Sequence, residues 1–354
     1  MLSERLKRAR KASNLSLRAV AEKVSVSHAA IKKYEDGINT PASTQLIELA
    51  KAYNVRLEYF FRPLNVELSG VEFRKRSNTP KRLLHKIEAE VLDQLERWQE
   101  LVNLYPEFPI KPFSPPANLP KNISNIDEIE AIAEQLREIW ELGTNPIADL
   151  VDTLETLGIW VLFANTQTND KFDGLMGHHK EQAVIVVSSN WTGDRQRFTL
   201  AHELGHLLLH GRLSTEIDEE KACNRFAGAF LLPQKTLKKH FGAESRHVEP
   251  RELYLLKREF GLSMGACLYR LLDTKLISRA TYTSLAKLFS KKGWWKKEPG
   301  EPIPAEKSFL FKQLVYRALA ENWASESKAA ELLGLPLIRF HQERKLEAMN
   351  AVVD

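Results

Sequence analysis

The sequence has very little cysteine and no long apolar run, and these two absences exclude several classes of protein. Only Cys223 and Cys267 occur in 354 residues, which excludes a disulfide framework and a zinc site built on Cys-x-x-Cys pairs. No stretch approaches the roughly 18 apolar residues that span a bilayer, and the N-terminus lacks the apolar core of a signal peptide. We therefore expect a cytoplasmic protein in which histidine and carboxylate side chains hold any metal ion.

A disorder-promoting composition is absent as well. Hydrophobic residues make up 43% of the chain and charged residues 27%, which is typical of folded proteins, and the length suggests two or three domains. The net charge of +5 is compatible with nucleic-acid binding, and the positive charge is concentrated at the N-terminus. Within the first 33 residues, only Glu4 and Glu22 oppose nine basic residues, which are Arg5, Lys7, Arg8, Arg10, Lys11, Arg18, Lys23, Lys32 and Lys33.

Residues 1–61 have the apolar periodicity of a series of short helices. Ser16 is a candidate N-cap of the second helix, the third begins at Ser27, and Thr40-Pro41 precedes the fourth. A supporting helix, a tight turn at residues 25–27 and a following helix are the layout of a helix-turn-helix, whose second helix enters the major groove of DNA. The side chains that we expect to face DNA are Ser27, His28, Ala29, Lys32 and Lys33.

The segment "VAEKVSVSHAAIKKYEDGINTPASTQLIELAKAYNV" resembles the Cro/C1-type (XRE) helix-turn-helix family almost element by element. This resemblance implies an all-α domain that binds double-stranded operator DNA, commonly as a homodimer. Arg18 and Ala19 replace the glutamine and the acidic residue that many members carry, so base specificity does not transfer. The alternative is a helical module that binds protein, and His28 fits a solvated surface histidine as well as a base-contacting one.

The middle of the chain changes from helix to a mixture of helix and strand. A long helix is predicted over residues 80–104, and six prolines between Pro106 and Pro120 indicate a linker. A helix over 126–140 precedes predicted strands at 159–163, 172–177 and 183–188, the last two joined by a His-His-Lys-Glu turn. Helices follow from Gly193 and over 219–232, and the rest is mostly helical, with a last helical pair over about 309–347.

The stretch "FTLAHELGHLLLHG" places His202 and His206 four residues apart, with Glu203 directly after the first. On a helix both imidazoles lie on one side, one turn apart, and can share one ion, whereas Glu203 points about a quarter turn away. This is the arrangement of His-Glu-x-x-His metallopeptidases, in which the glutamate is the general base. Zinc needs a third protein ligand, and Glu220, one turn from Asn224 on the next helix, is the candidate. The alternative is a helix with two solvated surface histidines.

Residues 173–233 resemble the ImmA/IrrE metallopeptidase family, in which "RFTLAHELGHLLLH" is followed by a helix like "CNRFAGAFLLP". Aligning Asn224 and the three residues after it with the family pattern maps the family's metal-binding glutamate onto Glu220, in preference to Glu219. The resemblance implies an α+β zincin-like domain with a small sheet, zinc as cofactor, and limited proteolysis of a regulatory protein, often a repressor or antitoxin. Cys223 replaces a usual alanine, and Ala222 a frequent second glutamate.

Several residues near this motif allow two interpretations. His210 either orients a metal ligand or stabilises the helix C-terminus through its dipole, and we favour the latter. His178 and His179 could stabilise an oxyanion, but we favour their assignment as surface-turn residues. Strand 183–188 is equally consistent with an edge strand that binds a substrate peptide and with an ordinary buried strand. Cys223 and Cys267 are expected to be small apolar side chains.

The tail segment "SKAAELLGLP" is similar to the first helix and turn of a DNA-binding unit. Pro336 makes a following recognition helix less natural, so a packing role, as a dimerisation element or a lid, is the favoured interpretation.

These patterns predict a mainly α, multidomain protein with four parts: a helix-turn-helix domain over residues 1–64, a helical connector and proline-rich linker over 65–120, a zinc metallopeptidase domain over 121–245 and a helical C-terminal region over 246–354. We expect a DNA-binding transcriptional regulator that cleaves a regulatory protein with zinc. The alternatives are a non-catalytic regulator or antitoxin whose zinc-type domain senses a ligand or binds a partner, and a peptidase whose N-terminal domain binds protein.

Overall fold

The computed structural model describes residues 1–62, 66–70, 80–166, 172–242 and 247–346. The chain forms two compact units. Unit 1 comprises residues 1–68, 74–111 and 308–354, and unit 2 comprises residues 69–73 and 112–307. Unit 1 is helical wherever it has regular structure, whereas unit 2 combines helices with a three-stranded sheet. A mainly α, multidomain fold with a small sheet in its second part is therefore confirmed.

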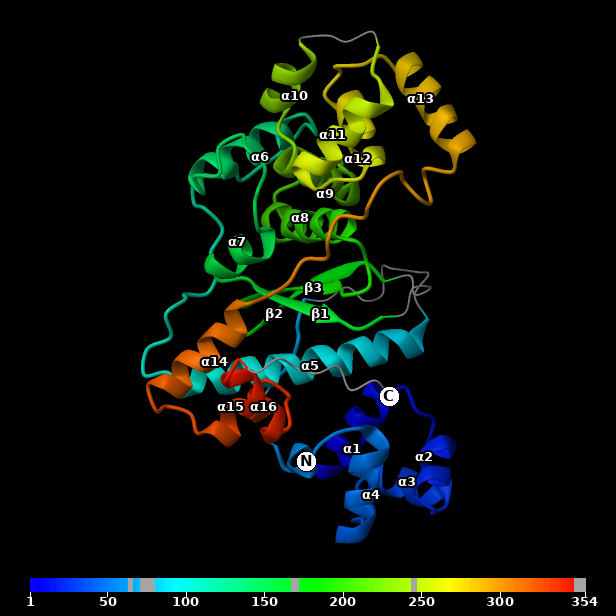
Figure 1. The fold of residues 1–354 in the computed structure, drawn as a ribbon, viewed down its shortest axis with the longest axis vertical. Helices are drawn as coiled ribbons and strands as arrows, with labels where there is room; N and C mark the ends of the chain where they lie inside the picture. Colours follow the sequence, from blue (N-terminus) through cyan, green and yellow to red (C-terminus); the bar gives the residue numbers. More distant parts are fainter. Residues whose placement is uncertain (63–65, 71–79, 167–171, 243–246, 347–354) are drawn as a thin grey trace. The chain divides into compact units, whose positions relative to one another are not determined.

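The N-terminal part of unit 1 is a bundle of short helices: α1 (Leu2–Ala12), α2 (Leu17–Lys23), α3 (His28–Glu35), α4 (Ser43–Tyr53) and the 3-10 helix η1 (Leu57–Phe61) (Figure 1). The predicted N-cap at Ser16 is confirmed, because its side chain accepts a hydrogen bond from the first turn of α2. Ser27 does not begin α3 but caps it in the same way, and the helix begins at His28. Between these helices Ser25 adopts a left-handed φ of 53°, which makes the tight turn. Helix α4 begins at Ser43 rather than at Thr40-Pro41, since the Gln45 side chain accepts the Ala42 amide hydrogen and fixes the start there.

The rest of unit 1 consists of α5 (Lys81–Leu104), α14 (Leu310–Ala320), α15 (Glu326–Leu332) and α16 (Leu337–Arg344). The prediction of two helices over residues 309–347 is wrong, because three helices occupy this segment. Pro336 does not prevent the last of them: it is the N-cap residue, a position where a missing amide hydrogen costs nothing. Edge-to-face pairs of Trp98 with Phe311 and of Tyr105 with Trp323 pack the tail against α5, at centroid distances of 4.9 and 4.8 Å.

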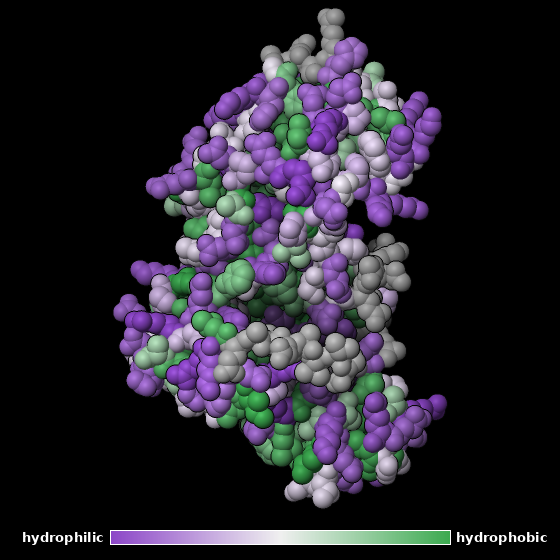
Figure 2. Space-filling view, viewed as in Figure 1, coloured by the Kyte–Doolittle hydropathy of each residue, from purple (hydrophilic) through white to green (hydrophobic). Residues whose placement is uncertain are grey.

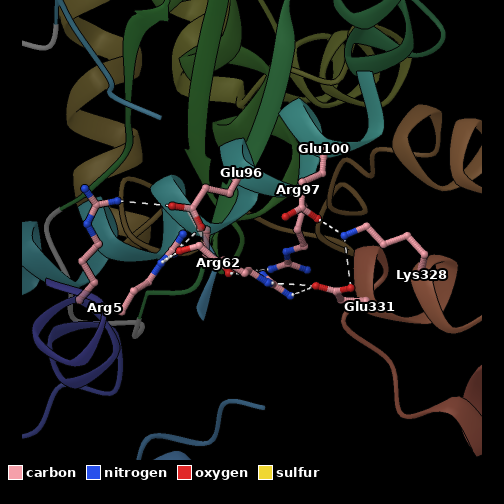
Figure 3. Close-up of polar contacts among 9 residues, drawn as sticks. Arg5, Arg62, Glu96, Arg97, Glu100, Lys328 and Glu331 are labelled. Atoms are coloured by element: carbon pink, nitrogen blue, oxygen red, sulfur yellow. Dashed lines mark hydrogen bonds and ion pairs between the residues drawn. The ribbon is translucent and has the colours of Figure 1, made fainter. Parts of the chain in front are cut away.

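Ion pairs join the three segments of unit 1, as Figure 3 shows. Arg5 of α1 donates to Glu96 of α5 at 2.5 Å, and both side chains are almost fully buried, with 1% and 5% exposed. Arg62 contacts Glu331 of α15 at 2.8 Å, and Lys328 contacts Glu100 of α5 at 2.6 Å. The C-terminal tail, whose packing partner the sequence did not identify, is thus joined to α5 and to Arg62 by ion pairs.

The sheet of unit 2 contains β1 (Trp160–Ala164), β2 (Gly174–His179) and β3 (Gln182–Ser188) in the order β1-β3-β2. Strand β3 pairs in parallel with β1 and antiparallel with β2. The hypothesis that residues 183–188 form an unpaired edge is therefore wrong, since β3 is central and its apolar side chains are buried. His178 and His179 also belong to β2 rather than to a turn, because the left-handed φ of 54° that reverses the chain lies at Lys180.

The helices of unit 2 cover the sheet and extend beyond it: α6 (Glu128–Ile139), α7 (Leu150–Thr156), α8 (Gly193–Leu209), α9 (Glu219–Leu231), α10 (Gln234–Phe241), α11 (Pro250–Phe260), α12 (Met264–Asp273) and α13 (Arg279–Lys292). Helix α8 lies against β2 and β3, and α9 packs on α8 (Figure 1). One continuous core joins the sheet to α6–α13. Among the described residues, no helix is long and apolar enough to cross a membrane.

An extended segment after α13 is attached to the start of α8. The Gly193 amide donates to the Ile303 carbonyl at 2.9 Å, and the Glu306 amide donates to the Gln196 side chain at 2.8 Å. Glu306 also forms an ion pair with Arg197 at 2.8 Å, with both side chains nearly buried. The first two turns of α8 are thereby held in place by a segment that follows α13.

Candidate metal centre and DNA-binding helix

Three predicted ligands come together between α8 and α9. The Nε2 atoms of His202 and His206 lie 3.1 Å apart, and Glu220 places Oε2 3.4 Å from the first and Oε1 3.4 Å from the second. Both imidazoles are largely buried, whereas the Glu220 side chain is 64% exposed. The two nitrogens and the Glu220 carboxylate are thus close enough together to share one metal ion.

The separations are close to those of groups that share one metal ion. A tetrahedral zinc ion with bonds of about 2.0–2.2 Å sets its ligand atoms roughly 3.3–3.6 Å apart, close to the spacings seen between these three residues. Two imidazoles and one carboxylate are a ligand set that zinc enzymes use when the fourth position is left for water. The side chains therefore fit a zinc ion in both chemistry and spacing.

The other nitrogen of each imidazole is occupied by a partner on α9. His202 Nδ1 lies 3.1 Å from Asn224 Oδ1, and His206 Nδ1 lies 3.0 Å from Glu219 Oε1. Because both partners are acceptors, each Nδ1 carries the hydrogen and each Nε2 keeps its lone pair directed at the common point. Sequence reasoning did not assign Asn224 and Glu219 this orienting role, although the need of a ligating histidine for a second partner could have indicated it.

Glu219 holds His206 as an ionised carboxylate. Burial opposes ionisation, but hydrogen bonds from His206 and His210 outweigh it and lower the pKa of Glu219. His210 lies 3.3 Å from the same carboxylate oxygen and its side chain is 71% exposed. His210 is thus a partner of the orienting carboxylate in addition to lying at the helix C-terminus.

Gly205 allows α8 and α9 to approach closely enough for these contacts. A methyl group at Gly205 would lie 3.2 Å from Cys223 Cα and 3.3 Å from Phe226 Cδ1. Cys223 sits between Glu220 and Asn224 on α9, so the close approach of the helices sets the position of the ligand and of one orienting residue. Burial raises the pKa of the Cys223 and Cys267 thiols, as expected for small apolar core residues.

Glu203, the predicted general base, is 2% exposed and lies beside the start of β2. A Cβ atom on Gly174 would be 3.6 Å from Glu203 Oε1, and only 2.5 Å from Thr199 Cγ2. The backbone of Gly174 therefore lies close to the Glu203 carboxylate. His179, in contrast, is buried and stacks on Trp160, so the prediction of a surface-turn histidine is wrong for this residue.

The predicted DNA-facing residues all lie at the exposed surface of α3 or at its N-cap. The Ser27 hydroxyl caps the helix by accepting from the Ala30 amide at 3.1 Å. His28, Ala29 and Lys33 are exposed, and Lys32 is exposed with Asp36 3.4 Å from its amine. The opposite side of α3 is fixed by buried Ile31 and by Arg10, which holds Glu35 through two hydrogen bonds of 2.6 and 2.8 Å. A rigidly mounted helix thus presents short and basic side chains to solvent.

Together, the fold and these two sites define a helix-turn-helix region joined to a metallopeptidase-like α+β domain. Comparison with known families agrees: residues 6–60 match the family model described as helix-turn-helix, and residues 154–272 match the peptidase family model described as IrrE N-terminal-like domain. No match was found among curated proteins. The two matches confirm the predicted combination of an XRE-type DNA-binding region with an ImmA/IrrE-like domain.

Proposed function

We propose that this protein is a cytoplasmic transcriptional regulator that binds operator DNA through α3 and cleaves a regulatory protein with a zinc-dependent endopeptidase site. The observation that carries the peptidase part is the close grouping of His202, His206 and Glu220, in which the two Nε2 atoms lie 3.1 Å apart and each lies 3.4 Å from a Glu220 carboxylate oxygen, close to the ligand spacings around zinc. The family match over residues 154–272 supports the same class of chemistry. The substrate that we propose is a repressor or antitoxin.

In this proposal His202, His206 and Glu220 hold zinc, which supplies a Lewis acid that acidifies water and polarises the scissile carbonyl. Glu203 takes the proton of the attacking water and transfers it to the leaving amine. Asn224 and Glu219 keep both imidazoles in the tautomer whose Nε2 lone pair is free. Burial of Glu203 limits its motion and keeps bulk water away from the proton that it carries.

We propose that the substrate peptide lies along β2. Strand β2 is at the edge of the sheet, with β3 on one side and, among the described residues, only an isolated bridge between His178 and Ser69 on the other. Backbone groups at its Gly174 end lie beside Glu203 and can pair with an extended chain. This replaces β3, the strand that the sequence suggested for this role.

The experiment that tests the site is metal content per chain after exhaustive dialysis, on wild type, Glu220→Ala and Glu203→Gln. We expect one zinc per wild-type chain, loss of most of it in Glu220→Ala, and retention in Glu203→Gln, because Glu203 is not a ligand. Glu203→Gln then identifies the substrate as the protein that it binds but fails to cleave. A wild-type chain that holds no zinc even when zinc is supplied during refolding would contradict the peptidase proposal.

The competing function is a non-catalytic regulator or antitoxin whose zinc-type domain senses a ligand or binds a partner. It would keep stoichiometric zinc but show the same cellular level of the target protein in wild type and Glu203→Gln. DNA binding is tested separately by Lys32→Ala and Lys33→Ala, which should weaken salt-dependent duplex binding.

The proposal of a DNA-binding peptidase also includes the domain boundaries predicted from sequence and a homodimeric state.

A further inference from the structure

Residues 275–297 form the most positively charged stretch of the chain outside the N-terminus. They contain seven lysine and arginine residues and no acidic residue, so their charge of +7 exceeds the net charge of +5 of the whole protein. Five of the seven form what we call the lysine patch: Lys287, Lys291, Lys292, Lys296 and Lys297. All five are exposed, on α13 and on the turn that follows it.

The lysine patch has no carboxylate partner in the described part of the chain. The nearest acidic residues in sequence are already engaged: Asp273 pairs with Arg270 at 3.2 Å, and Glu298 pairs with Lys257 at 2.8 Å. Glu298 also accepts the amide hydrogens of Met264 and Gly265 at the start of α12. Five like charges within residues 287–297 repel, which costs stability, and no contact in the described part of the chain offsets this cost.

The patch is also held in a defined conformation. Gly293 ends α13 in a left-handed conformation, and the Lys296 and Lys297 amides both donate to its carbonyl at 3.1 Å. The indole of Trp295 donates to the Ser290 hydroxyl at 3.1 Å and ties the turn to the last helical turns of α13. The amines of α13 and of the turn are therefore presented together, with little backbone entropy left to lose on binding.

The outward face of α13 distinguishes between the anionic partners that such a patch could bind. Its exposed side chains are small or basic: Ala280, Thr283, Ser284, Lys287, Ser290 and Lys291. A helix that binds a membrane surface needs an apolar face to enter the lipid, and the apolar side of α13, with Leu285 and Phe289, is buried in the core of unit 2. Figure 2 shows hydrophilic side chains gathered over α13, as a phosphate backbone requires.

We propose that the lysine patch is a second, sequence-independent binding surface for double-stranded DNA, which contacts phosphates with its five amines. Duplex DNA is the polyanion for which the same polypeptide already carries a binding region, because α3 belongs to the segment that matches the helix-turn-helix family model. The patch would hold unit 2 on the DNA that unit 1 recognises, so that the peptidase-like domain meets proteins bound there. This inference does not depend on whether the metal site cleaves its partner.

The test is equilibrium binding of the full-length protein to a labelled random-sequence 40-base-pair duplex across a series of salt concentrations. The patch variant is Lys291→Gln, Lys292→Gln and Lys296→Gln combined. The matched control is Lys121→Gln, Lys238→Gln and Lys239→Gln, which removes the same charge from exposed lysines of unit 2, two of them also in the last turn of a helix. Far-ultraviolet circular dichroism establishes that both variants retain their helices.

We expect the slope of log K against log salt, which is negative, to become less steep by about 2–3 in the patch variant, since each phosphate contact contributes about −0.9. Binding should weaken roughly 10- to 100-fold at 0.1 M salt. The control should change the slope by less than about 1. The effect should persist when Lys32→Ala and Lys33→Ala remove the contribution of α3, which separates it from the helix-turn-helix.

Equal slopes for the patch variant and the control would overturn the proposal. The same would follow if the patch variant lost binding to vesicles rich in phosphatidylserine, or to polyglutamate, while its duplex binding equalled that of the control. Those outcomes would assign the patch to a membrane surface or to an acidic protein.

Discussion

Replacement of Gly205 by alanine tests whether the closeness of α8 and α9 controls the metal centre. The added methyl group would lie 3.2–3.3 Å from three carbon atoms of α9, whereas carbon atoms in good contact are about 3.5–4.0 Å apart. The helices must therefore separate by roughly 0.3–0.5 Å near Cys223. Metal ligands tolerate displacements of only about 0.2 Å, so Glu220 should no longer reach the ion with good geometry.

We expect Gly205→Ala to weaken zinc binding about 10-fold or more, measured by competition with a chromophoric chelator. Its effect on the metal-free fold should be small, because the gain of about 1 kcal/mol in helix propensity offsets part of an overpacking cost of about 1–3 kcal/mol. The control is Gly228→Ala on α9, where the nearest atom to the new methyl group is Arg270 Cδ at 3.2 Å, away from the ligands. Wild-type zinc affinity in Gly205→Ala would refute the reasoning.

Three further substitutions test separate contacts. Asn224→Leu should weaken zinc binding roughly 10- to 100-fold with the ligands intact, as measured by the same competition, and unchanged affinity would show that its contact does not orient the imidazole. Gly193→Ala should lower the free energy of unfolding in urea by about 1–2 kcal/mol, because the added Cβ would lie 2.0 Å from the Pro304 carbonyl oxygen. Helix propensity alone predicts a gain in stability. A more stable variant would therefore argue against the attachment of the segment after α13 to α8. Arg5→Met should lower the free energy of unfolding by about 3–5 kcal/mol, because it leaves Glu96 buried without its main partner. Adding Glu96→Met should restore most of this loss. A second loss of stability in the double variant would contradict this account.

Local features of this protein were predictable because they follow from periodicity and capping. The helix-turn-helix elements appeared at the expected places, since Ser16, Ser25 and Ser27 act through contacts within a few residues of themselves. The grouping of His202, His206 and Glu220 was predictable for a related reason. His202 and His206 share a helical face by their spacing, and the resemblance supplied Glu220.

Features that depend on contacts between distant residues were not predictable in this way. The order of the strands places β3 in the centre, and nothing in its own sequence distinguishes a central strand from an edge strand of a buried sheet. The packing of the tail on α5 depends on pairs such as Lys328 with Glu100, which are 228 residues apart. The orienting contacts of Asn224 and Glu219 likewise require the relative placement of α8 and α9.

Unit 1 is built from segments on both sides of residues 112–307, so most of unit 2 is an insertion in the sequence of unit 1. One peptide-bond cleavage inside residues 112–307 leaves each fragment covalently attached to a part of unit 1, whose α5 and α14 remain packed together through Trp98 and Phe311. Residues 1–62, in contrast, have one covalent connection to the rest of the chain. A single cleavage just after them would leave the DNA-binding helices attached only by non-covalent contacts such as that between Arg5 and Glu96. Cleavage at that connection would therefore leave the link between these helices and the rest of unit 1 dependent on such contacts.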